Sequence, residues 1–182
     1  MIAPRLKSER LLLREWVSSD EEPFMALNRD PHVMELFPNL LTPEESAQFI
    51  TRSKNLLAEK KFGLWAVETQ DSKEFIGFIG LNEPTWDAHF TPCIEIGWRL
   101  AKKFWGRGFA TEGARRVLEY AFDDLKLQEV VSFTSPLNQR SIKVMEKIGM
   151  KRNRTEDFDH PKVEKGHRLE RHVLYRLKQA PR

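Results

Sequence analysis

The sequence predicts an α/β fold in which one mixed sheet of about seven strands carries about four helices on its faces. Strand-like and helix-like segments follow one another in the order strand, two helices, three strands, helix, strand, helix and two strands. A glycine-rich turn in mid-sequence joins one of these strands to the most regular of the helices. The 182 residues are 40% hydrophobic and 31% charged, which suits a single domain over residues 1–182 with its own core.

The chain is predicted to open with a strand and a short helix. Arg10–Trp16 (RLLLREW) has the composition of a first strand. Ser19-Asp20-Glu21-Glu22 is predicted to cap a helix that ends near Asn28. Two proline-containing breaks, Asp30-Pro31 and Phe37-Pro38, then interrupt the helical pattern.

A second helix is predicted from Pro43 to about Lys60. Thr42 is placed as its N-cap, and Pro43 as its first residue, where a missing N–H costs nothing. Glu45 follows three residues after Thr42, which is the spacing of a capping box.

Three strands are predicted next. Phe62–Glu68 and Phe75–Leu81 flank the polar turn Gln70-Asp71-Ser72-Lys73. Pro92–Leu100 is the third strand, and its side chains alternate between two faces. One face holds Ile94, Ile96, Trp98 and Leu100, and the other holds Glu95, Gly97 and Arg99.

The segment Lys103–Thr111 (KFWGRGFAT) is predicted to form an anion-binding turn at the start of a helix from Thr111 to about Leu125. Glycines let the main chain approach a ligand closely, and the first N–H groups of a helix point outward without intrahelical partners. The helix dipole adds positive potential there, so a pyrophosphate is the expected guest. The helix has one apolar face, made by Ala110, Ala114, Val117, Leu118, Ala121, Phe122 and Leu125.

The last third of the chain contains a further helix between strands. The predicted strands are Glu129–Ser135, about Lys151–Asp157, and His172–Leu177. Asn138 is predicted to cap the helix Gln139–Ile148, which Gly149 ends in a left-handed conformation.

Two motifs resemble those of the GNAT acyl-CoA-dependent N-acetyltransferases, in particular the RimJ/RimL-like branch. Lys103-Phe104-Trp105-Gly106-Arg107-Gly108 fits that family's acetyl-CoA loop, with lysine in the first position, and continues into Ala110-Thr111-Glu112. Asn138-Gln139-Arg140-Ser141, followed by Glu146-Lys147-Ile148-Gly149, is similar to the second motif. The resemblance covers almost the whole chain.

The resemblance implies the GNAT fold, whose sheet is mixed and mostly antiparallel with splayed central strands. It also implies direct acetyl transfer from acetyl-CoA to a primary amine, most favourably a protein or peptide N-terminal amine. The turn would hold the pyrophosphate, the preceding strand the pantetheine arm, and an N–H group near Trp98 the thioester oxygen. Acetyl-CoA contacts are thus expected from Trp98, Arg99, Leu100, Lys103, Gly106, Arg107, Gly108, Phe109, Ala110, Thr111, Asn138 and Ser141.

Glu95 is the best candidate for the base that removes a proton from the amine, because it is a carboxylate on an otherwise apolar strand. Desolvation there would raise its pKa toward a useful range. The alternative is a charge satisfied by Arg99 on the same face. Asp159 or His160 could also act as base.

Ser141 is the candidate acid for the leaving thiolate, since many family members use a tyrosine that is absent between Tyr120 and Tyr175. The alternative is a serine that serves only the first turn of the helix. Asn138 is interpreted both as the N-cap and as a contact to the cofactor arm near the reacting atoms.

The acceptor side is less well defined by sequence. Trp86, Asp159 and His160 are weaker candidates for acceptor binding, against an alternative in which the aspartate caps a local turn. A small-molecule amine as the acceptor, or a non-catalytic acyl-CoA-binding module, is the competing hypothesis to the peptide acetyltransferase.

Several classes are disfavoured by composition. A net charge of +3, from 30 basic and 27 acidic residues without a dense basic tract, argues against a nucleic-acid partner. One cysteine, Cys93, excludes a disulfide scaffold, and the five histidines lack metal-ligand spacing, so no metal is assigned. No apolar run approaches the length of a membrane span, and no signal sequence is evident. We expect a cytoplasmic monomer or homodimer.

Overall fold

A nine-stranded sheet forms the centre of the computed structural model, which describes residues 4–179. Its strand order is β1-β2-β3-β4-β5-β6-β9-β7, and β8 pairs with β9 beside β7. All neighbouring pairs are antiparallel except β5 and β6, which confirms the predicted mixed, mostly antiparallel sheet. The strands are β1 (Leu6–Lys7), β2 (Leu11–Arg14), β3 (Leu64–Thr69), β4 (Phe75–Asn82), β5 (Glu95–Leu100), β6 (Glu129–Thr134), β7 (Lys151–Arg152), β8 (Phe158–Asp159) and β9 (Arg171–Lys178).

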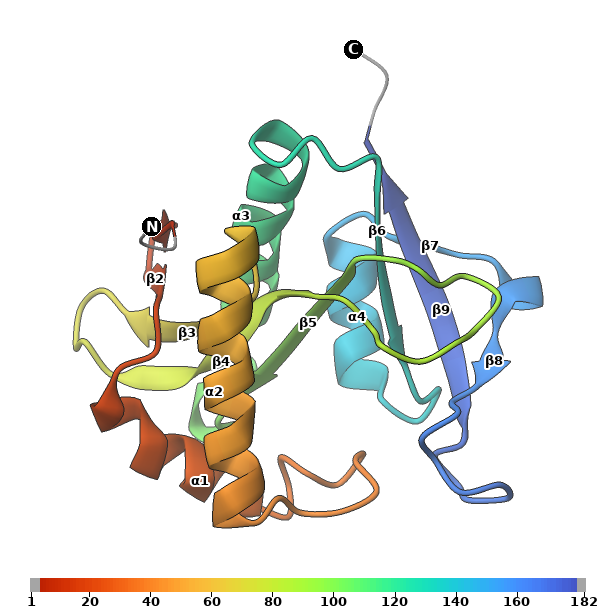
Figure 1. Cartoon of the computed structure of the whole chain (residues 1–182), viewed down its shortest axis with the longest axis horizontal. Coiled ribbons are helices and arrows are strands. Elements are labelled where there is room, and N and C mark those ends of the chain that lie inside the picture. Colours follow the sequence, from red (N-terminus) through yellow and green to blue (C-terminus); the bar gives the residue numbers. More distant parts are fainter. Residues whose placement is uncertain (1–3, 180–182) are drawn as a thin grey trace.

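Four α-helices cover the sheet, as predicted, and α1 and α2 lie on the face opposite α3 (Figure 1). Phe78 of β4 packs its ring against Phe24 of α1 and Phe49 of α2. On the other face, Gly113 of α3 lies so close to Ile79 that an added Cβ would clash with it. The helices are α1 (Glu21–Arg29), α2 (Pro43–Lys60), α3 (Phe109–Asp123) and α4 (Gln139–Lys147), with 3-10 turns at Ser18–Asp20, Lys102–Phe104 and Arg154–Glu156.

The start of α2 confirms the predicted capping box. The Glu45 main-chain N–H donates to Thr42 Oγ1 at 3.1 Å, and the Thr42 N–H donates to Glu45 Oε2 at 2.8 Å. The prediction that a side chain caps the start of α1 is wrong. Asp20 forms no side-chain cap, because its buried carboxylate accepts hydrogen bonds from the Val17 N–H at 2.9 Å and Arg14 at 2.7 Å.

Several element boundaries differ from those predicted. The strand expected over Lys151–Asp157 is broken, since the Asn153 side chain accepts the Thr155 N–H at 3.2 Å and starts a 3-10 turn between β7 and β8. The strand expected from Pro92 begins at Glu95, and the helix expected from Thr111 begins at Phe109. The short strand β1 was not predicted, because two residues leave no readable alternation.

The core has two parts, and the larger one extends across the junction between β5 and β6. It packs α1, α2 and α3 against the sheet and continues to β6, α4 and β9 through Val130, Met145 and Tyr175. The smaller part is mostly aromatic and lies against β6, β8 and β9, around Phe90, Val131, Phe158 and Leu174, with Trp86 and Phe133 against it. Among residues 4–179, every helix is too short or too polar to span a bilayer.

The parallel strands β5 and β6 are paired only at Glu95 and Val131. At this end of the pair the Val131 N–H donates to the Ile94 carbonyl at 2.9 Å. Beyond it the strands separate, with α4 beside the gap (Figure 1). The sheet is therefore split in its middle, as expected for splayed central strands.

Replacing Thr42 by alanine should destabilise the protein by about 1 kcal/mol, because the first turn of α2 loses an acceptor for the Glu45 N–H. Urea unfolding measures the difference. Thr42→Ser keeps the hydroxyl and should stay within a few tenths of a kcal/mol of the wild type; equal loss in both variants would contradict the capping interpretation.

Candidate active site

The open edge of β5 is the frame of the site. Along a strand, the main-chain N–H and C=O groups of successive residues point to opposite edges. The Ala101 N–H donates to the Ile76 carbonyl, so Ala101 and every second residue before it face β4. Trp98 and Leu100 therefore present their N–H and C=O groups to the split, where Trp105 Nε1 already donates to the Leu100 carbonyl at 2.7 Å. The main chain of Arg99 faces β4, so only its side chain can reach a ligand.

The glycine turn leads directly into α3. Gly106 and Gly108 have φ angles of 74° and 81°, in the left-handed region that favours glycine. Gly108 is the N-cap residue of α3, so the free N–H groups of the helix begin at Phe109. Two guanidinium groups lie over the Phe109 ring, that of Arg10 at 4.6 Å and that of Arg107 at 4.7 Å. The turn thus combines free donors with positive charge.

A cavity of about 290 Å³ lies between this turn, β5 and α4. Most of the predicted acetyl-CoA contacts line it, but Lys103 and Arg107 do not, and Lys103 forms an ion pair with Glu74. Predicted residues lining the cavity are Trp98, Arg99, Leu100, Gly106, Gly108, Phe109, Ala110, Thr111, Asn138 and Ser141.

The cavity also contains a basic stripe that the sequence analysis missed. Arg140, Lys143 and Lys147 project into its lining from α4, and the Arg140 guanidinium lies 4.3 Å from the centre of the Trp105 ring. Their spacing of three and four residues places them on one face of a helix, which is the signal that could have identified them. A stripe of this kind suits an anionic ligand.

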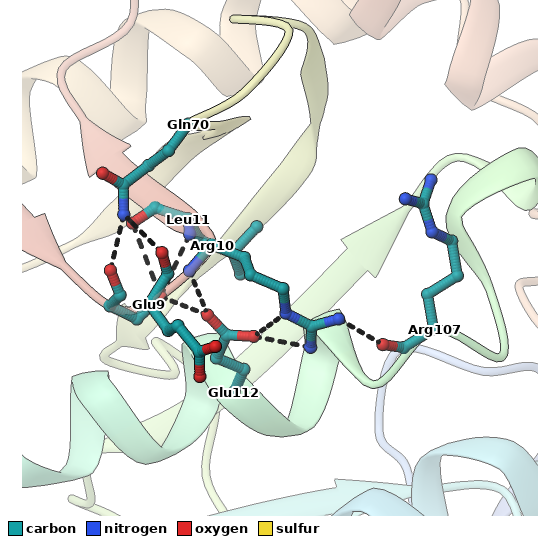
Figure 2. Close-up of polar contacts among 7 residues, drawn as sticks. Glu9, Arg10, Leu11, Gln70, Arg107 and Glu112 are labelled. Atoms are coloured by element: carbon teal, nitrogen blue, oxygen red, sulfur yellow. Dashed lines mark hydrogen bonds and ion pairs between the residues drawn. The ribbon is translucent and has the colours of Figure 1, made fainter.

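The N-terminal strands clamp the glycine turn to α3 through Arg10 and Glu112 (Figure 2). Glu112 Oε2 accepts Arg10 Nε at 2.7 Å, while its Oε1 accepts the Arg10 N–H at 2.7 Å and Ser8 Oγ at 2.8 Å. Arg10 Nη1 then donates to the Arg107 carbonyl at 3.0 Å. We name this set the Arg10–Glu112 clamp; its partners lie about a hundred residues apart, so local sequence pattern gave no sign of it.

A second cavity, of about 370 Å³, continues from the first along β5. The two share Leu36, Phe37, Trp98, Arg99, Asn138 and Ser141 in their linings. The second cavity adds Glu95, Phe133, His160 and His172. The candidate base and the glycine turn therefore open onto one connected space, at different positions along the same strand.

Glu95 has a neutral partner. Asn82 Nδ2 donates to Glu95 Oε2 at 3.4 Å, and burial raises the pKa of this carboxyl to about 7, with Asn82 opposing the shift. The alternative in which Arg99 satisfies Glu95 is wrong, because Arg99 Nη1 donates instead to Asn28 Oδ1 at 2.7 Å. Glu95 is thus poised to exchange a proton near neutral pH.

Asn138 and Ser141 meet at the start of α4. Asn138 Oδ1 accepts the Ser141 N–H at 3.2 Å, which confirms the predicted N-cap, and Asn138 Nδ2 donates to Thr134 Oγ1 at 3.1 Å. Both residues line both cavities. The cap therefore holds Ser141 at the junction of the two spaces.

The weaker acceptor candidates divide into two groups. The His160 ring lies 4.8 Å from both Trp86 and His172, and burial, helped by the charge of His172, lowers its pKa to about 4. His160 and His172 line the second cavity, with Trp86 against His160. Asp159 lies outside the lining, where its exposed carboxylate accepts Arg171 Nη1 at 3.1 Å.

Other reactive groups do not join this site. Burial raises the pKa of the Cys93 thiol to about 11, so the thiolate is scarce at neutral pH. Residues 4–179 bring together no group of three or more His, Cys, Asp or Glu side chains that could hold a metal ion.

Comparison with known proteins agrees with this geometry. The family described as Acetyltransferase (GNAT) domain matches residues 10–151. The chain belongs to the GNAT family. It is 30% identical over 148 residues to the uncharacterized N-acetyltransferase YnaD of Bacillus subtilis (strain 168), covering 81% of this chain and 82% of YnaD.

Two further similarities bear on the activity. The FsC-acetyl coenzyme A-N(2)-transacetylase of Aspergillus fumigatus is 35% identical over 154 residues, which are 81% of this chain and 65% of that protein. The crystal structure of a GNAT-family acetyltransferase from Bacillus anthracis superimposes with a TM-score of 0.78 at 27% identity, covering 96% of this chain and 98% of that one. This GNAT protein is an N-acetyltransferase, and its family uses acetyl-CoA.

Replacing Glu112 by glutamine should destabilise the fold by about 2 kcal/mol at pH 7, since charge-assisted bonds from Arg10 are lost. Burial works against the ionised carboxylate, but hydrogen bonds from Arg10 and Ser8 outweigh it and hold the pKa of Glu112 below its usual range. A lowered pKa stabilises the fold above the unfolded-state pKa of about 4.3, and the contribution is lost as pH falls below that value.

Thermal unfolding of wild type and Glu112→Gln at pH 7 and pH 3 tests this, with the difference expected to shrink at pH 3. Glu119→Gln is the matched control, because Glu119 is exposed on the same helix and pairs weakly with Arg116 at 3.5 Å. An equal difference at both pH values would show that the charge of Glu112 is unimportant.

Proposed function

We propose that this enzyme transfers an acetyl group from acetyl-CoA directly to an N-terminal amine of a protein or peptide, within a ternary complex. The observation that carries the proposal is the connected space along the open edge of β5. Glu95, with a pKa of about 7, opens onto one part of it and the glycine turn onto the other. An acyl donor and an amine can thus meet beside Trp98.

We propose that the pyrophosphate binds the N–H groups from Gly108 to Thr111, supported by the α4 stripe of Arg140, Lys143 and Lys147. Arg107 contributes charge from beside the turn, and Lys103, paired with Glu74, contributes only long-range potential. The pantetheine arm would add to β5 like a strand at Trp98 and Leu100. This leaves the side-chain face of Glu95 to the acceptor.

The chemistry then follows from positions on β5. The Trp98 N–H, on the open edge, would stabilise negative charge on the thioester oxygen. Glu95, ionised above pH 7, would take the proton of the attacking amine, directly or through water. An α-amino group has a pKa of about 7.7–8.0 and a lysine about 10.4, so a base of this strength suits an N-terminal amine better.

Ser141 is proposed to donate a hydrogen bond to the leaving sulfur. A thiol has a pKa near 8.5 and leaves readily, so this contribution is small. Asn138 orients α4 through its cap and so places the Ser141 hydroxyl. His160, Trp86 and His172 would form the far wall of the acceptor site.

Peptide acceptors are favoured by the RimJ/RimL-like motifs together with the pKa of Glu95. A small-molecule amine is the second candidate, favoured by similarity to the A. fumigatus protein, whose name describes an N(2)-transacetylase. Release of free thiol from acetyl-CoA should be measured with peptides of varied N-termini, polyamines and aminoglycosides. Peptides should rank first; turnover with small amines alone would overturn the peptide proposal.

Replacing Glu95 by glutamine should lower kcat/KM for the amine by about a hundredfold or more, since the base is removed without changing shape. The wild-type rate should rise with pH through about 7, as Glu95 loses its proton, whereas the variant should keep only the rise near pH 7.7–8.0 that follows deprotonation of the α-amino group itself. Thiol release from pH 6 to 9 measures both. Glu59→Gln, an exposed change on α2, is the control, and a wild-type-like profile in Glu95→Gln would exclude Glu95 as base.

Ser141→Ala should lower kcat by about tenfold while KM for acetyl-CoA stays nearly constant, because the hydrogen bond forms as charge develops on sulfur. Ser141→Thr keeps the hydroxyl and should recover most of the rate. Unchanged kcat in Ser141→Ala would show that water protonates the thiolate instead.

A further inference from the structure

Arg99 carries a charge at the junction of the two cavities, on a half-buried side chain. Its side chain lines both of them, with the guanidinium 4.1 Å from the centre of the Phe37 ring and 5.5 Å from that of Phe78. Within residues 4–179 its hydrogen-bond partner is an amide, Asn28 Oδ1 at 2.7 Å, rather than a carboxylate. Nε of Arg99 is buried and has no hydrogen-bond partner in this part of the chain.

This arrangement is costly without a ligand. Buried charges in proteins are normally paired, because desolvation of an ion is otherwise uncompensated. Burial lowers the pKa of Arg99 to about 10, and no charge among the described residues offsets the shift. The protein nevertheless fixes the guanidinium in place, since fully buried Asn28 is itself held by its Nδ2 donating to Ser46 Oγ at 3.0 Å. A rigid, unpaired cation in a cavity is suited to an anionic guest.

The position of Arg99 indicates which guest. Its side chain lies on the α1–α2 face of β5, the face of Glu95, whereas the glycine turn leads into α3 on the opposite face. The pyrophosphate site also has its own cations on α4. Between Glu95 and Arg99 only Gly97 intervenes on this face, and an added Cβ there would meet a single atom within 4 Å, Glu95 Oε1 at 3.8 Å. The path between them is therefore open.

We propose that Arg99 binds an anionic group of the acceptor, so that the preferred acceptors are amines that also carry a carboxylate. This rests on the proposed function and deepens it. Four strand residues span roughly 13 Å, within which the amine would lie near Glu95 and the carboxylate near Arg99. In a peptide, the carboxylate would be an acidic side chain close to the N-terminus.

The test compares matched acceptors. Thiol release from acetyl-CoA is followed with peptides that begin Ser-Asp or Ser-Asn and are otherwise identical, and with 4-aminobutanoate against its amide. Wild-type enzyme should favour the acid of at least one pair by about tenfold or more in kcat/KM, mainly through KM, as expected for a charge-assisted bidentate contact. Absence of a preference in both pairs overturns the role of Arg99.

Variants assign the preference to one side chain. Arg99→Gln should abolish it and leave KM for acetyl-CoA within about twofold, while Arg99→Lys should retain part of it. Arg52→Gln, which removes an exposed arginine from α2, is the matched control and should keep the full preference. Thermal unfolding shows whether each variant is folded. If Arg99→Gln is unfolded, the acceptor preference of Arg99→Lys is compared with that of the wild type instead.

The remaining outcomes are distinct. If Arg99→Gln raises KM for acetyl-CoA strongly and equally with both members of a pair, the guanidinium serves the donor and the proposal is wrong. If peptides are inert but 4-aminobutanoate is preferred over its amide, the peptide function fails while the role of Arg99 stands. If peptides are acetylated without regard to Asp or Asn, and the small pair shows no preference, the peptide function stands alone.

Discussion

The separation of β5 from β6 is the constraint on which the site depends. A parallel pair joined only at Glu95 and Val131 leaves Trp98 and Leu100 with main-chain groups unpaired by any strand among the described residues. Unpaired groups inside a sheet are unfavourable unless another partner satisfies them. Trp105 supplies one at the Leu100 carbonyl, and an extended ligand arm could supply the others. The split thus serves as a binding edge rather than a packing fault.

Side-chain hydrogen bonds support each side of the split. On the β5 side, the Arg10–Glu112 clamp joins the first strands to the glycine turn, and Arg99 joins β5 to α1 through Asn28. On the β6 side, Asn138 joins the end of that strand to α4 through Thr134. Each side of the split is therefore supported by side-chain hydrogen bonds of its own.

Much of this was predictable from local pattern. The capping box of Thr42 and Glu45, the two faces of Glu95's strand and the cap at Asn138 each depend on residues close together in the chain, and periodicity identified them. The Arg10–Glu112 clamp and the Asn28 partner of Arg99 depend on contacts between segments far apart in the sequence, and a periodic pattern does not reveal such contacts. The carboxylate of Asp20 lies between these cases, since a helix cap was predicted and an ion pair with Arg14, six residues earlier on β2, took its place.

Glu95 and Arg99 carry opposite charges on one face of β5 but do not pair with each other. Two opposite charges on one strand face could pair if their side chains bent toward each other, yet each is held by a neutral amide instead, Glu95 by Asn82 and Arg99 by Asn28. Pairing would give both groups ordinary, fully charged states and close the space above Gly97. Neutral partners keep Glu95 protonatable near pH 7 and keep the guanidinium of Arg99 free at Nε. The two amides thus keep Glu95 able to exchange a proton and Arg99 able to bind an anion. The cost in stability would be offset by a bound acceptor.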